Sequence, residues 1–165
     1  MATVTLKGNT QTTIGNLPIV GQKAPDFSLK MVDLSSTTLG DYAGSNVILN
    51  IFPSIDTATC ATSVRTFNQR ASEIENTKVI CVSRDLPFAQ KRFCGAEGIE
   101  NVINGSDFAT GDFGKSYGVE LIDGPLQALH ARAVVVIGAD GIVKHTELVS
   151  EIVDEPNYDA ALAAV

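Results

Sequence analysis

Apolar and polar positions in the middle of the chain predict a strand, a helix and a second strand in close succession. The segment 46–53, NVILNIFP, is almost wholly apolar, which is typical of a strand buried on both faces, and Pro53 ends it. From Cys60 onward apolar residues recur at helical spacing, so a helix is expected to about Asn76. The apolar segment 78–83 is a strand again. This succession predicts a βαβ unit with a right-handed crossover and parallel strands.

Alternation and turn residues predict two antiparallel hairpins. In residues 4–14, VTLKGNTQTTI, two β-favouring runs flank Lys-Gly-Asn, which predicts an N-terminal hairpin. The segments 132–138 and 142–148 are joined by Ala-Asp-Gly, in which the Asp-Gly pair supplies the positive φ angles of a tight turn. The second hairpin is therefore the clearest in the sequence.

Three further helices and a short strand complete the pattern. The strand is expected at 27–32, and the helices at 86–98, 112–119 and 157–165. Within 86–98, Pro87 lies near the helix start and Gly95 is the expected stop. No repeat or linker divides residues 1–165, so one domain is expected. The sum is an α/β fold of the thioredoxin-like type, with helices flanking a mixed central sheet and an added N-terminal β-hairpin.

Composition and charge exclude several classes of partner. The chain has 165 residues, 44% of them hydrophobic, with a net charge of -7 and a pI near 4.7. This acidic balance argues against nucleic acid or an anionic membrane as a partner. No apolar run is long enough for a signal peptide or a bilayer span. A soluble, cytoplasmic protein is therefore expected, with export to the periplasm by another route left open.

The three cysteines, Cys60, Cys81 and Cys94, cannot all pair with one another, so at least one thiol needs another explanation. Cys81 lies inside the apolar segment 78–83 and is expected to be a packed core residue. Cys60 follows the carboxyl end of an apolar strand, where the sites of open α/β sheets collect, and lies in the first turn of a helix. That position stabilises a thiolate.

Two residues before Cys60 strengthen a functional interpretation of this thiol. Thr57 can act as the helix N-cap or as a hydrogen-bond partner for an incoming oxygen. Pro53 can shield the sulfur without adding a donor. Each residue alone has an ordinary alternative, which is a packed cysteine, a plain N-cap and a strand terminator respectively. Their spacing, taken together, favours function.

Proline, three residues, threonine, two residues and cysteine is the active-site signature of the peroxiredoxins, and Pro53, Thr57 and Cys60 fill it. With LNIFPSIDTATCATSVRTFNQRA, LPFAQKRFCGAEG and ARAVVVI, almost the whole chain resembles the bacterial thiol peroxidase branch, the atypical two-cysteine peroxiredoxins. The resemblance implies that Cys60 is the peroxidatic cysteine, Cys94 the resolving cysteine and Arg132 the arginine that reaches the sulfur. It also implies a homodimer whose disulfide forms within one chain and is reduced by thioredoxin.

The chemistry expected of these residues is the reduction of hydrogen peroxide and organic hydroperoxides. Attack by a thiolate builds negative charge on the departing oxygen, which Arg132, the Cys60 N–H and the Thr57 hydroxyl can receive as donors. Attack leaves a sulfenic acid at Cys60, and Cys94 condenses with it to a disulfide. Because a disulfide needs Cα atoms within about 7 Å, we expect the segment 86–98 to unfold locally.

The other motifs in the sequence do not support a different function. FGKS, residues 113–116, resembles a phosphate-binding loop, but the first glycine of that pattern would fall at Ala109. Asn-Gly-Ser at 104–106 is expected to be a turn. His130 and His145 are the only histidines and no Cys-x-x-Cys pair is present, so neither a metal site nor a cofactor is expected.

Two functions from different classes remain open at this point. The first is a thioredoxin-dependent peroxidase, and the second is a redox-switched binding protein that uses the same pair of thiols. Turnover distinguishes them, because a switch needs to react only once while an enzyme must cycle with a reductant. A disulfide oxidoreductase is disfavoured because the chain lacks the Cys-x-x-Cys motif.

Overall fold

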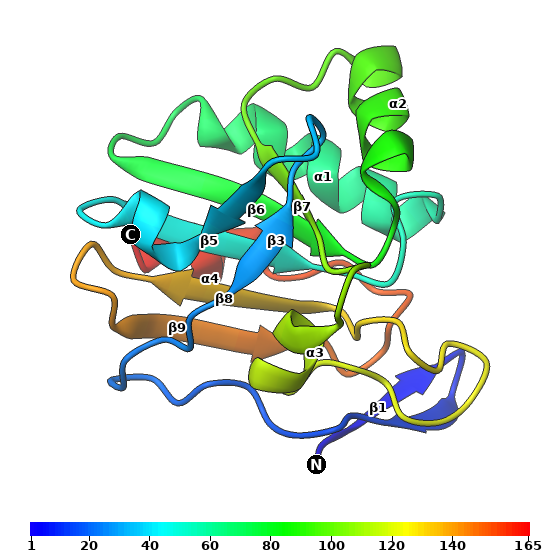
Figure 1. The fold of residues 1–165 in the computed structure, drawn as a ribbon. Coiled ribbons are helices and arrows are strands. Elements are labelled where there is room, and N and C mark those ends of the chain that lie inside the picture. Colours follow the sequence, from blue (N-terminus) through cyan, green and yellow to red (C-terminus); the bar gives the residue numbers. More distant parts are fainter.

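The computed structural model describes all residues, 1–165, as a seven-stranded mixed sheet with helices on both faces and a separate two-stranded hairpin (Figure 1). The strands are β1 Thr3–Leu6, β2 Asn9–Thr12, β3 Ser28–Lys30, β4 Ser36–Thr38, β5 Asn46–Ile51, β6 Thr77–Ser83, β7 Ile103–Ser106, β8 Ala133–Ile137 and β9 Val143–Leu148. The helices are the short 3-10 helix η1 Leu39–Tyr42, α1 Ala58–Ala71, α2 Pro87–Glu97, α3 Asp112–Ser116 and α4 Tyr158–Ala163. None of them is long and apolar enough to cross a membrane.

Strand β5 lies in the interior of the sheet, between β6 and β8, as its apolar sequence predicts. The strand order is β4-β3-β7-β6-β5-β8-β9, and β5 pairs with β6 in parallel and with β8 antiparallel. Every residue of β5 after Asn46 is buried, because helices cover both faces of the sheet at this strand. The predicted βαβ unit is therefore present as β5, α1 and β6, and the predicted second hairpin as β8 and β9.

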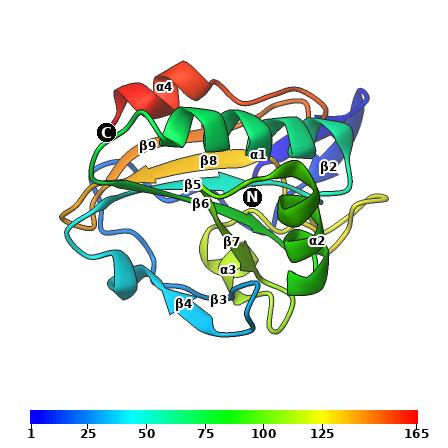
Figure 2. The ribbon, with the colours of Figure 1, turned by 90° about the horizontal axis from the view of Figure 1, so that it is seen from above.

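Two apolar cores hold the sheet from opposite faces (Figure 2). On one face α1 and α4 pack over β5 and β8, and Phe67 and Ala161 are buried there. On the other face the rings of Phe113 and Tyr117 stack with centroids 4.4 Å apart, and Phe27 meets both rings edge-on. The loop that joins β5 to α1 therefore starts from a strand that is buried on both faces of the sheet.

Two helix ends differ from the sequence prediction. Helix α1 begins at Ala58, after the extended Thr57, so Cys60 lies in its first turn as expected. It ends well before Asn76, which has φ of 50° and cannot continue a helix. The predicted stop at Gly95 is wrong, because α2 runs on to Glu97 and Gly98 takes the left-handed conformation, with φ of 66°.

The expected turn at 104–106 is wrong as well, because these residues belong to β7. This strand pairs in parallel with β6 and antiparallel with β3. Gly105 allows the close packing of β3, since a Cβ atom there would lie 2.7 Å from Cδ1 of Leu29. Strand β4 and helix η1 also have no counterpart in the prediction. The elements β3, α3 and α4 lie within their predicted segments but are shorter.

The N-terminal hairpin forms as predicted from β1 and β2. Its turn residues, Lys7 and Gly8, both have positive φ angles, of 50° and 81°, which match the twist of a two-residue hairpin loop. The hairpin does not pair with any strand of the seven-stranded sheet. It is therefore held by contacts with segments outside that sheet, among them an isolated bridge from Thr5 to Glu151.

Two glycines with similar φ angles should differ strongly in their tolerance of a side chain. Gly118 has φ of 71°, and a Cβ atom there would lie 2.2 Å from the carbonyl oxygen of Asn16. Gly141 has φ of 81° with nothing within 4 Å of the same position. We expect Gly141→Ala to lower the free energy of unfolding by about 1 kcal/mol through backbone strain alone. Gly118→Ala should cost about 3 kcal/mol, because the backbone near Asn16 must also move.

Urea denaturation of both variants and the wild type checks this prediction. Equal losses in the two variants would mean that the close approach of Gly118 to Asn16 is absent in solution.

Candidate active site

Cys60 lies in the first turn of α1 and is completely buried. Thr57 accepts the N–H of Ala61, and this is the first hydrogen bond of the helix. The N–H groups of Ala58, Thr59 and Cys60 itself donate no hydrogen bond. Three unpaired donors and the positive end of the helix dipole therefore lie in the helical turn that carries Cys60.

Arg132, directly before β8, is the charged group closest to this thiol. Its side chain is only 1% exposed, and Nη2 lies 3.3 Å from Sγ of Cys60. Nε donates to the carbonyl oxygen of Ile152 at 2.8 Å, and Nη1 has no partner. No carboxylate forms an ion pair with Arg132. Arg132 therefore places a buried positive charge beside the sulfur with no carboxylate to neutralise it.

Pro53 and Thr57 belong to the loop of residues 53–57 that leads to Cys60. Pro53 is buried and Thr57 is exposed. Thr57 occupies the N-cap position of α1, but its hydroxyl caps no helix N–H and donates instead to the carbonyl oxygen of Ser54 at 2.9 Å. The expectation that this hydroxyl caps the helix is therefore wrong, while its expected hydrogen bond to a substrate oxygen stays a prediction. A hydroxyl that has committed its proton can still accept a hydrogen bond from a substrate.

Asp85, which follows β6, holds this loop in place. Its carboxylate accepts the hydroxyl of Ser54 at 2.7 Å, the N–H of Ile55 at 2.7 Å and the hydroxyl of Ser83 at 2.6 Å. Asp85 is not among the site residues predicted from the sequence. The signal that could identify it is its place at the end of a strand parallel to β5, since such ends meet at one edge of the sheet.

Cys94 lies on α2, is half-buried and forms no disulfide with Cys60. Burial raises the pKa of the Cys94 thiol, while a hydrogen bond from Nδ2 of Asn104 at 3.0 Å partly opposes this effect. Helix α2 is tied to α1 and to the loop before it by two ion pairs on the surface. These are Arg65 with Glu97 at 2.9 Å and Arg92 with Asp56 at 2.7 Å.

Cys81 on β6 is completely buried in the core between the sheet and α1, as expected. Burial raises the pKa of its thiol to about 12, although the side-chain amide of Asn50 lies 3.7 Å from the sulfur and opposes the shift. This thiol is therefore protonated at neutral pH and unsuited to nucleophilic attack.

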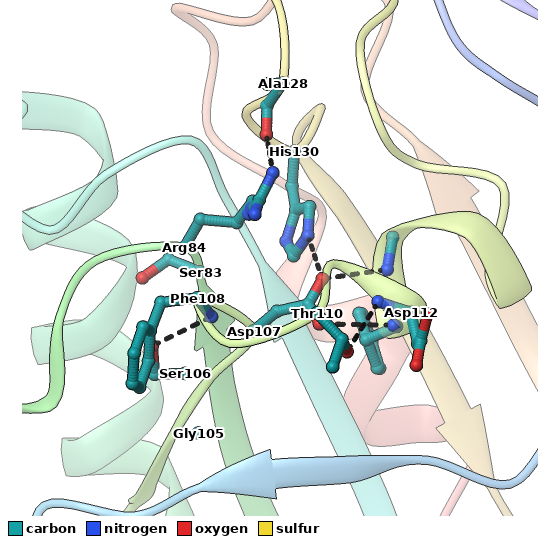
Figure 3. Close-up of polar contacts among 12 residues, drawn as sticks. Ser83, Arg84, Gly105, Ser106, Asp107, Phe108, Thr110, Asp112, Ala128 and His130 are labelled. Carbon is teal, nitrogen blue, oxygen red and sulfur yellow. Dashed lines mark hydrogen bonds and ion pairs between the residues drawn. The ribbon is translucent and has the colours of Figure 1, made fainter.

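A second buried polar cluster joins β7 to the segment before β8 (Figure 3). Asp107 accepts Nε2 of His130 at 2.9 Å, with both side chains almost fully buried. It also accepts the N–H groups of Phe113 and Gly114 at 3.2 and 3.0 Å. Asp107 thus fastens α3 and His130 together, and neither His130 nor His145 bonds to a cysteine. No three His, Cys, Asp or Glu side chains come together as metal ligands.

This geometry can be compared with known proteins. Residues 19–162 match the family model described as Redoxin. The chain belongs to the redoxin family.

Relatives of this redoxin are thiol peroxidases and similar proteins. The thiol peroxidase of Mycobacterium bovis is 59% identical over 165 residues, which cover 100% of this chain and 99% of the relative. A crystal structure of a peroxiredoxin-like protein from Aquifex aeolicus matches with a TM-score of 0.93 at 40% identity, covering 99% of this chain and 95% of that one. A thiol peroxidase from Chromobacterium violaceum matches with a TM-score of 0.90 over 98% and 93% of the chains, and at 21% identity it shows the shared fold alone.

The comparisons confirm three expectations from the sequence. The thioredoxin-like fold with an N-terminal hairpin is the fold of this redoxin. Its family is that of the thiol peroxidases, and its class of activity is thiol-dependent peroxide reduction. The redoxin is therefore an enzyme of the peroxiredoxin type.

Asp85→Asn should disturb the loop of residues 53–57 without disturbing the helix that carries Cys60. An amide cannot accept all three hydrogen bonds that the carboxylate accepts, so we expect the free energy of unfolding to fall by about 2 kcal/mol. The misplaced loop should slow oxidation of Cys60 by hydrogen peroxide roughly tenfold, because small displacements of reacting groups are costly. The rate of Cys60 oxidation is measured by mixing the reduced protein with one equivalent of peroxide and quenching the reaction at successive times.

The matched control is Asp56→Asn, which removes an exposed ion pair with Arg92 from the same loop. Exposed ion pairs contribute little in water, so its rate of Cys60 oxidation should equal that of the wild type. A wild-type rate in Asp85→Asn would show that this carboxylate does not order the site.

Proposed function

We propose that this redoxin reduces hydrogen peroxide and organic hydroperoxides by attack of the Cys60 thiolate, with Cys94 as the resolving thiol and thioredoxin as the reductant. One observation carries the proposal: the buried Arg132 guanidinium has no carboxylate partner and lies 3.3 Å from Sγ of Cys60. Its role would be to stabilise both the thiolate and the charge that develops on the departing oxygen.

In the first step an S–O bond forms and the O–O bond of the peroxide breaks. The sulfur lone pair attacks one oxygen, and the other leaves with the electron pair and takes a proton as water or an alcohol. Nη1 of Arg132 is a buried donor without a partner and can serve that departing oxygen. The unpaired N–H groups of the first turn of α1 add further donors. The Thr57 hydroxyl donates to the carbonyl oxygen of Ser54, so its oxygen can accept a hydrogen bond from the O–H of the hydroperoxide and orient the substrate.

In the second step the Cys94 thiolate attacks the sulfenic sulfur, so that an S–S bond forms and hydroxide leaves as water. The two thiols lie on different helices and both are free. Helix α2 must therefore leave its place, at least around Cys94. Two of its ties to the rest of the site, the ion pairs of Arg92 and Arg65, are exposed and cost little to break. The buried side chains of Gln90 and Phe93 must also leave their places if the whole helix unfolds, so unwinding of the last turns around Cys94 is the less costly motion.

We further propose a homodimer located in the cytoplasm. Leu86, Phe88 and Phe108 are exposed apolar side chains, and they follow β6 and β7 at the edge of the sheet where the Cys60 loop also lies. Val153 is exposed as well, and its carbonyl oxygen accepts the hydroxyl of Thr59 beside Cys60. Apolar groups gathered around a site are typical of an interface. Free thiols suit a reducing compartment.

Turnover of the cysteine variants tests the proposed roles. The assay follows NADPH consumption with thioredoxin, thioredoxin reductase and cumene hydroperoxide. We expect no activity in Cys60→Ser, because the attacking sulfur is missing. Cys94→Ser should react with peroxide once and fail to cycle, because no disulfide can form. Cys81→Ser is the matched control and should retain turnover, since this thiol only packs in the core.

Activity that survives Cys60→Ser would contradict the mechanism. If the wild-type protein reacts once and never cycles with thioredoxin, a redox-switched binding protein becomes the better account of the same thiols.

Disulfide formation should change the mobility of α2. We expect amide hydrogen exchange over residues 87–97 to be faster in the oxidised protein than in the reduced one, because α2 can no longer pack as a continuous helix. The amides of β5 provide the internal control and should exchange equally slowly in both states. Identical exchange of α2 in the two states would show that no such unfolding accompanies the disulfide.

A further inference from the structure

The N-terminal hairpin pairs with a segment that leads to the active site. Strand β1 lies beside residues 150–152 and apart from the seven-stranded sheet (Figure 1). The N–H of Thr5 donates to the carbonyl oxygen of Ser150 at 2.8 Å, and the N–H of Ile152 donates to the carbonyl oxygen of Thr5 at 2.8 Å. Residues 150–152 are thus held against β1 by an isolated parallel bridge between Thr5 and Glu151.

Glu151 strengthens this attachment from the side-chain side. Its carboxylate accepts the N–H of Gly8 at 2.8 Å, the N–H of Lys7 at 3.1 Å and the hydroxyl of Thr5 at 3.2 Å. Desolvation raises the pKa of Glu151, but hydrogen bonds led by those from the N–H groups of Gly8 and Val153 outweigh it, and the pKa is lowered. The carboxylate is therefore charged at neutral pH and fixes the turn of the hairpin to this segment.

The side chain, the N–H and the carbonyl oxygen of Ile152 each have a partner. Its side chain packs in a small buried cluster with Val4, Leu121 and Ala131, of which Val4 comes from β1. Its N–H is bonded to the hairpin, and its carbonyl oxygen accepts Nε of Arg132 at 2.8 Å. The hairpin therefore determines where this carbonyl oxygen lies.

The carbonyl oxygen of Ile152 in turn determines where the guanidinium of Arg132 points. It is the only oxygen that this guanidinium bonds, and the other bond of the group goes to Sγ of Cys60. Because a guanidinium is planar and rigid, fixing Nε fixes the direction of both terminal nitrogens. A shift of Ile152 would turn Nη2 away from the sulfur.

We propose that the N-terminal hairpin positions Arg132: β1 and Glu151 fix the backbone of Ile152, whose carbonyl oxygen directs the guanidinium toward Cys60. Glu151 is thus a positioning residue that acts through Arg132 and touches no reacting atom. The inference rests on the role proposed above for Arg132 in peroxide reduction.

The test measures oxidation of Cys60 by one equivalent of hydrogen peroxide in the full-length reduced protein. Glu151→Ala should slow this reaction roughly fivefold, a factor typical of one lost hydrogen bond in the transition state. Glu151→Gln keeps one oxygen as an acceptor and should fall between the alanine variant and the wild type. Asp123→Asn is the matched control, since Asp123 accepts the N–H of Thr12 on β2 at 2.8 Å and does not touch residues 150–152. Its rate should be unchanged.

A double-mutant cycle with Arg132→Lys separates positioning from general stability. Lysine has no rigid fork to direct, so Glu151→Ala should have no further effect on the rate in the Arg132→Lys background. Thermal unfolding of each variant shows that it is folded at the assay temperature, and Glu151→Gln carries the test if the alanine variant does not fold.

Several outcomes would overturn the proposal. An equal effect of Glu151→Ala in both backgrounds, or an equal slowing by Asp123→Asn, would show that the hairpin acts through stability alone. A wild-type rate in Glu151→Ala and Glu151→Gln, with a reduced rate in Arg132→Lys, would overturn only the positioning role. A wild-type rate in Arg132→Lys would overturn the proposed role of Arg132 itself.

Discussion

The burial of one guanidinium without a carboxylate partner is the constraint on which the site depends. Arg132 is 1% exposed and forms no ion pair. Removing such a charge from water is costly unless nearby groups replace its hydration. Here the replacements are a backbone carbonyl oxygen, that of Ile152, and the sulfur of Cys60. Because the sulfur is one of only two groups that offset the cost of burying Arg132, the stability of the fold is linked to the geometry at Cys60.

Two acids that follow parallel strands of the sheet bond to groups other than Arg132. Asp85 follows β6 and Asp107 follows β7, at the same edge of the sheet. Asp85 accepts two hydroxyls and one backbone N–H, while Asp107 accepts two backbone N–H groups and His130 (Figure 3). The hydroxyl of Ser106 also bonds the carbonyl oxygen of Asp85, which joins the two regions. Both carboxylates therefore brace loops, and neither neutralises the buried cation.

The sequence predicts the central βαβ unit and both hairpins because their patterns are strong, and the spacing of Pro53, Thr57 and Cys60 predicts the candidate site. It fails at β7, where Asn-Gly has the composition of a turn but close packing of Leu29 requires a glycine in a strand. The direction of the Thr57 hydroxyl follows from the loop conformation, which spacing does not specify. The roles of the Ile152 carbonyl oxygen and Asp85 depend on which segments meet in space. Every residue has a backbone carbonyl, so the amino-acid type gives no sign that the one at Ile152 has a special role.

The partial burial of Cys94 has a consequence for the order of events in a catalytic cycle. Burial raises the pKa of this thiol, so in the folded helix Cys94 would be a poor nucleophile toward a peroxide. When α2 unwinds, the thiol meets water, its acidity returns toward the ordinary value, and a larger fraction becomes thiolate. In the proposed cycle, the same motion that brings the second sulfur within reach would also activate it. The time for which α2 stays helical would then set the lifetime of the sulfenic acid.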